Sequence, residues 1–161
     1  AAAGEAGGAA RMFDEAMAHL RRAARLDHIA PGLVDRARFL LARDPTQAAR
    51  DLDEALTIAA GRGFRLVEAD VHLTRARLAV LAQDMTLAES SLQRSRALLT
   101  ETGFELRMPM QWLTEAVVHA ARGRREAAAQ AILAAKQRID EMGMHGIRSE
   151  LERVTRIVES E

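Results

Sequence analysis

Several residue types on which many folds depend are absent or scarce in this chain of 161 residues. It has no cysteine, no tyrosine and only three prolines, and aromatic residues make up 3% of it. The lack of cysteine excludes a disulfide framework, thiolate metal sites and a cysteine nucleophile. Because 23 basic residues balance 23 acidic ones, a general nucleic-acid surface is not expected. No apolar run approaches the roughly 18 residues that span a bilayer and the start does not resemble a signal peptide, so we expect a cytoplasmic protein.

The abundant residues favour helices. The chain contains 33 alanines and 22 arginines, and both residue types have high helix propensity. Seven glycines, from Gly32 to Gly146, fall between apolar-periodic segments, where helices are expected to stop. The prediction is an all-α protein, and the length suits one domain.

A constant interval of forty positions relates three parts of the sequence. Gly63, Gly103 and Gly143 are separated by this interval, and a bulky apolar residue follows each of them. Small and large residues upstream recur at the same interval, which indicates a repeated structural unit. The matching sets are Ala48, Ala88 and Ala128; Leu52, Leu92 and Ile132; and Ala55, Ser95 and Ala135.

Each repeated unit reads as a pair of helices, because apolar residues recur every three or four positions in both of its halves. Asp44 and Asp84 are expected to cap the second helix of their units. The segment around Asp27, His28, Pro31 and Gly32 is interpreted as a turn between helices. The eight predicted helices are 9–28, 32–43, 46–60, 65–82, 86–101, 106–121, 125–141 and 146–159.

This arrangement resembles the tetratricopeptide repeat. That family has a small residue in its first helix, followed by an alanine, a large residue and a small residue in its second. The matching residues here are Ala76, Ala88, Leu92 and Ser95, then Ala116, Ala128, Ile132 and Ala135, and Trp112 falls on the family's tryptophan position. Three features depart from the family: the unit is longer than the family's usual repeat, His72 replaces the tryptophan, and no proline closes the second helix.

The longer unit is similar to the long-helix repeats of bacterial STAND-type signalling ATPase regulators. The resemblance implies a right-handed α-solenoid of antiparallel helix pairs, with about eight helices. It also implies a non-catalytic protein–protein interaction module within a larger, bacterial regulatory or signalling protein. The alternative is a ligand-sensing domain that passes small-molecule binding to an attached ATPase or transcription-regulator domain.

The first residues differ in composition from the rest. Residues 1–8 are small, and we interpret them as a flexible lead-in to a repeat domain over residues 9–161. The first predicted helix matches the second helix of a repeat and lacks its first helix, which suggests an array that continues upstream. The apolar face left open there could also pair with a second copy, so a homo-oligomer formed through the array ends is possible.

No motif for catalysis or nucleotide binding is present, so we expect no enzyme activity and no cofactor. Glu68 and His72, like Glu115 and His119, lie four residues apart on one helix face. A metal site would need a third ligand from another helix, and we interpret both pairs as local ion pairs. Acidic residues lie near the arginine clusters, so solvated helix faces explain them better than an anion or nucleic-acid patch.

The first helix of each pair in a stacked array normally faces the concave side. Its exposed residues would mix charge with apolar area, as suits a peptide or a helix lying in a groove. The residues expected to form this partner groove are Asp70, Thr74, Arg77, Met110, Thr114 and Val117.

Overall fold

A computed structural model describes the backbone of residues 2–160 and the side chains of residues 7–160. These residues form eight α-helices and two short 3₁₀ helices, with no β-strand among them, so the all-α prediction is confirmed. None of the helices in this range is long and apolar enough to cross a membrane. The elements are α1 (Ala2–Arg22), α2 (Leu26–Leu40), α3 (Pro45–Arg62), α4 (Arg65–Leu81), α5 (Met85–Thr102), η1 (Glu105–Arg107), α6 (Met108–Ala121), α7 (Arg125–Glu141), η2 (His145–Ile147) and α8 (Arg148–Ser160).

The turns that separate the helices recur at the predicted interval. Gly63 and Gly103 end α3 and α5 in the left-handed conformation, with φ of 70° and 64°, a region that glycine enters without steric cost. Asp44 and Asp84 act as predicted caps, since their side chains accept hydrogen bonds from the amides of Gln47 and Leu87 at 2.9 Å.

In two other turns, a residue other than glycine has the left-handed conformation. Ala24, between α1 and α2, has a φ of 52°, and Gln83, between α4 and α5, has a φ of 58°. Gln83 precedes Gly123, which has a φ of 68°, by the full repeat interval. Ala24 precedes Gly63 by one position less than that interval.

The first turn of the chain differs from the prediction. Helix α1 ends at Arg22 and α2 begins at Leu26, so the Asp27–His28 segment lies in the first turn of a helix and Pro31 lies inside it. The interpretation of this segment as a turn is wrong. Pro31 is the sixth residue of α2 and has no amide hydrogen, so α2 lacks the hydrogen bond to the carbonyl of Asp27.

Glycine also has a different role in α2 from the predicted one. Gly32 does not stop a helix, because it lies within α2, where a Cβ atom would come 3.1 Å from the Met17 sulfur. Its small size therefore lets α1 pack closely on α2. The expected boundary after Gly8 does not mark a helix start either, since α1 already begins at Ala2; Ala1 lies outside the described residues.

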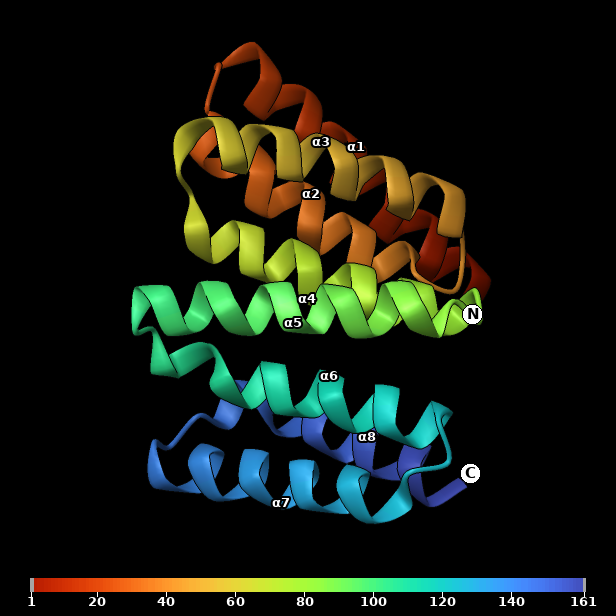
Figure 1. The fold of residues 1–161 in the computed structure, drawn as a ribbon. Helices are drawn as coiled ribbons and strands as arrows, with labels where there is room; N and C mark the ends of the chain where they lie inside the picture. Colours follow the sequence, from red (N-terminus) through yellow and green to blue (C-terminus); the bar gives the residue numbers. More distant parts are fainter. Residues whose placement is uncertain (1, 161) are drawn as a thin grey trace.

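Figure 1 shows the helices stacked from α1, α2 and α3 at the top, through α4 and α5, to α6, α7 and α8 at the bottom. The pairs α2–α3, α4–α5 and α6–α7 are hairpins whose two helices contact each other. Helix α4 contacts α2 on one side and α6 on the other, and α6 also contacts α8. The helices α3, α5 and α7 each contact the helix that follows them.

The residues of the repeat register form the centre of these contacts. Ala48, Ala88 and Ala128 are fully buried, which allows the helices of a hairpin to approach closely. Leu52 is fully buried as well, and Leu92 is 8% exposed. The small residues of the register are therefore buried in all three hairpins, whereas the large residue is buried in the first two and Ile132 in the third is only partly buried.

Candidate functional site

One recess in the structure lies where four helices converge. It is a cleft of about 730 Å³, and residues of α2, α4, α6 and α8 line it together with the turn after α2 and with η2. Its lining includes four arginines and one glutamate among many apolar residues. The charged residues are Arg38, Arg43, Arg77, Glu150 and Arg153.

Three of the six predicted groove residues line this cleft, namely Arg77, Met110 and Val117. The other three, Asp70, Thr74 and Thr114, do not line it.

The prediction that those three residues are exposed is wrong. Thr114 is fully buried, and Asp70 and Thr74 are 8% and 2% exposed. Long arginine side chains from neighbouring helices cover them. Arg38 donates to the Thr74 hydroxyl at 3.3 Å, and Arg77 donates to the Thr114 hydroxyl at 3.1 Å.

Arg77 is the central charged residue of the cleft. Its guanidinium bonds to Glu150 of α8, and its Nη2 atom is buried without a hydrogen-bond partner among the described residues. Burial lowers the pKa of Arg77, and the Glu150 carboxylate opposes that shift. Arg153 also donates twice to Glu150, at 2.8 Å. Two guanidiniums therefore share one carboxylate, which leaves an excess of positive charge at this point.

Glu150 is held in its ionised form by the same contacts. Burial favours the neutral acid, but hydrogen bonds from Arg153 and Arg77 keep the pKa of Glu150 below its usual value. The Glu150 carboxylate is thus a fixed part of the cleft wall. Its hydrogen bond with Arg77 links α8 to α4.

Arg43 stands at the edge of the cleft. Its guanidinium lies 4.5 Å from the centre of the Phe39 ring and donates to the Phe39 carbonyl at 2.9 Å. No carboxylate of the described residues forms an ion pair with it. Leu81, 55% exposed, lines the same cleft. The edge thus combines a cation that has no acidic partner among the described residues with exposed apolar surface.

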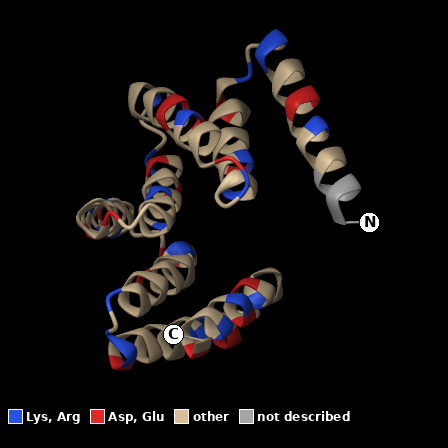
Figure 2. Ribbon diagram, turned by 90° about the vertical axis from the view of Figure 1, so that its right-hand side faces the viewer, with Lys and Arg blue, Asp and Glu red and all other residues tan. Residues whose placement is uncertain are grey.

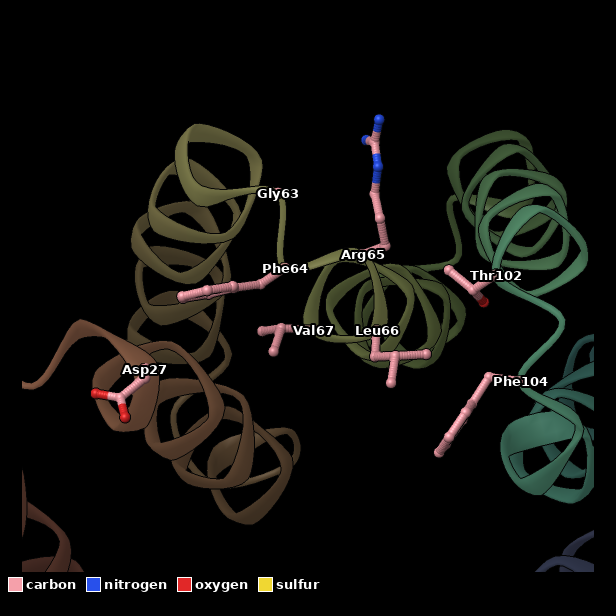
Figure 3. A pocket seen from close by; sticks show the side chains of 8 residues that line it. All are labelled: Asp27, Gly63, Phe64, Arg65, Leu66, Val67, Thr102 and Phe104. Atoms are coloured by element: carbon pink, nitrogen blue, oxygen red, sulfur yellow. The ribbon is translucent and has the colours of Figure 1, made fainter.

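One face of α4 contributes residues both to the cleft and to a second recess. Leu66, Asp70, Thr74 and Arg77 follow one another at intervals of three or four residues, so they share a helix face. Leu66 lines an apolar pocket of about 600 Å³, shown in Figure 3, whereas Arg77 lines the cleft. Phe64 and Phe104 contribute to the apolar pocket.

A belt of side chains crosses α4 between the two recesses. Asp70 lies between Arg38 of α2, at 3.5 Å, and Arg107 of η1, at 3.2 Å. Burial raises the pKa of Asp70, and the two arginines oppose that shift. Arg38 and Arg107 therefore reach Asp70 from two different neighbouring elements, and this Arg38–Asp70–Arg107 belt links α2, α4 and η1.

The histidines do not form the pairs considered from the sequence. Glu68 pairs with Arg65, and Glu115 bonds to Gln111 and Arg96. The Nδ1 atoms of His72 and His119 are buried without a hydrogen-bond partner in the described part of the chain. No group of three possible metal ligands occurs among the described residues.

The interpretation of the arginine clusters as solvated helix faces does not fit Arg77, whose side chain is 13% exposed. Figure 2 shows basic and acidic residues interspersed along the helices. Ion pairs such as Arg122–Glu89 and Arg75–Asp53 link neighbouring helices across this surface.

Sequence reasoning missed four charged residues of the cleft, which are Arg38, Arg43, Glu150 and Arg153. An indirect signal for Arg38 is the repeat itself, because stacked hairpins place their first helices, here α2 and α4, side by side. Glu150 lies 73 residues from Arg77, and no periodicity in the sequence links these two positions.

Comparison with known proteins identifies no relative: no family model, no curated protein and no solved structure matches the chain.

Proposed function

We propose that this chain is a non-catalytic interaction module of the tetratricopeptide-like type, arranged as a right-handed α-solenoid. In this proposal it belongs to a larger, bacterial regulatory or signalling protein and binds a peptide segment of a partner in the cytoplasm. The repeat register supports the fold part of the proposal, because caps, turns and buried alanines recur at the interval found in the sequence.

The observation that supports the binding part best is the origin of the cleft lining. Residues of α2, α4, α6 and α8 meet at one recess although they are far apart in the sequence. A stack of hairpins creates such a surface only when the first helices lie side by side. Recognition would then depend on a few side chains on rigid helices, with Arg77, Met110 and Val117 among them.

Peptide display against the intact chain tests the proposal. Peptides selected from a random library should lose binding to the Leu81→Glu variant, since this change places a charge at the edge of the cleft. Leu133→Glu is the matched control, because Leu133 is 65% exposed on α7 and does not line the cleft. If no peptide is selected, or if both variants lower binding equally, the peptide-binding proposal is wrong.

The second candidate is a ligand-sensing domain that passes small-molecule binding to an attached ATPase or transcription-regulator domain. The size of the cleft favours this candidate, since about 730 Å³ lies within the range of small-molecule sites.

A further inference from the structure

We infer that the cleft between α2, α4, α6 and α8 binds a small anionic amphiphile, a molecule with one carboxylate or phosphate group and an apolar body. The inference rests on the second candidate function and names the chemistry of its ligand. Two properties of the cleft lead to it: its charge and its apolar walls.

The charge of the lining favours an anion. Four arginines and one glutamate line the cleft, and Arg77 and Arg153 both use Glu150 as their partner. Arg43 also lines the cleft, and it forms no ion pair with a carboxylate of the described residues. An anionic group of a ligand beside Arg43 would gain a charge-assisted hydrogen bond.

The walls of the cleft favour an apolar body next to that anion. Apolar side chains from all four helices or the turns next to them surround the arginines, and exposed Leu81 leaves apolar area open to a ligand. Burying this area on a hydrocarbon or an aryl group would be favourable. The apolar residues used here are Phe39, Val80, Leu81, Met110, Ile147 and Ile157.

Binding of decanoate, measured by isothermal titration calorimetry below its micellar concentration, tests the inference. We expect saturable binding of one decanoate per chain. Decanol, which has the same tail without the charge, and acetate, which has the charge without the tail, should bind at least tenfold more weakly. Decyltrimethylammonium, with the opposite charge, should not compete. Decyl phosphate, measured in parallel, shows whether the site prefers phosphate or carboxylate.

Two arginine substitutions, each removing one positive charge, test whether decanoate binds in the cleft. Arg43→Gln removes a cation that lines the cleft and should weaken decanoate binding about tenfold, as expected for the loss of one charge-assisted contact. Arg50→Gln is the matched control, because Arg50 is an exposed arginine of α3 outside the cleft lining. Both variants should keep the helical circular dichroism of the native chain.

The inference is overturned if decanol binds as tightly as decanoate, or if Arg43→Gln and Arg50→Gln bind decanoate equally. It is also overturned if no decanoate binds. Selected peptides that bind the cleft while decanoate does not would reject the inference and keep the interaction-module proposal. Decanoate binding without peptide binding would favour the ligand-sensing function instead.

Discussion

Helix α1 and the second helices of the three hairpins have the same register but different surroundings. In α3, α5 and α7, the small residues Ala55, Ser95 and Ala135 are fully buried. In α1, Phe13 and Ala16 lie thirty-nine positions before Leu52 and Ala55 and are their equivalents. Ala16 is exposed, and Met12 nearby is 72% exposed. The small residue of the register is therefore buried in the three hairpins and exposed in α1, so the register alone does not bury it.

The largest expected effect comes from placing a charge at the large residue of this register. Leu92→Asp puts a carboxylate at a position that is 8% exposed, and burying an unpaired charge should cost more than about 4 kcal/mol. Phe13→Asp changes the equivalent residue of α1, which is only half-buried, and should cost about 1–2 kcal/mol. Urea denaturation followed by circular dichroism measures both variants.

This prediction has a clear opposite outcome. If Leu92→Asp remains as stable as Phe13→Asp, the middle hairpin does not depend on the repeat register, and the comparison between α1 and α5 fails.

A smaller effect is expected at Arg36, which contacts both regions. It donates to Asp51 of α3 at 2.7 Å through two nitrogens and to Asp14 of α1 at 2.8 Å. Asp51 is 1% exposed and Asp14 is 70% exposed at the side chain. Arg36→Met leaves a buried carboxylate unpaired and should cost about 3–5 kcal/mol, whereas Asp14→Ala should cost less than about 1 kcal/mol. Urea denaturation measures the free energy of unfolding of both variants. Equal losses in Arg36→Met and Asp14→Ala would contradict the expectation that the exposed ion pair to α1 contributes less than the buried one to α3.

The smallest effect concerns pH and compares His72 of α4 with His19 of α1. Burial, together with Arg75 and Arg94, lowers the pKa of His72 from 6.5 to about 4. Between these two values the unfolded chain binds more protons than the folded one, so stability is full above pH 6.5 and falls as the pH decreases toward 4.

The matching measurement is the melting temperature between pH 7 and pH 4. It should fall by roughly 2–5 °C more in the native chain than in His72→Gln. The melting temperature of His19→Gln, a change at an exposed position of α1, should fall by as much as that of the native chain. An unchanged pH slope in His72→Gln would contradict the assignment to His72.

Most helices could be predicted because their signals are local. The aspartate caps and the glycines at positions 63, 103 and 143 act through hydrogen bonds and φ values within a few residues. The turn between α1 and α2 could not be predicted in this way. Gly32 and Pro31 are usual signals of a turn, but the contact of Gly32 with Met17 of another helix decides the structure there.

The cleft was predicted only in part for a related reason. Repeat register places Arg77, Met110 and Val117 on the correct face, because helical spacing alone determines it. The burial of Thr74 and Thr114 depends instead on how far arginine side chains from neighbouring helices reach. Such contacts depend on three-dimensional packing that spacing along one helix does not describe.

The two turns with side chains in the left-handed conformation offer a route to a more heat-resistant protein. Ala24 and Gln83 have φ values of 52° and 58°, where the related turns use Gly63 and Gly123. A Cβ atom makes this backbone region unfavourable by roughly 1 kcal/mol for each residue. Ala24→Gly and Gln83→Gly would remove that penalty at two surface positions outside the cleft. The double variant would be a more thermally stable protein for ligand screening and crystallisation.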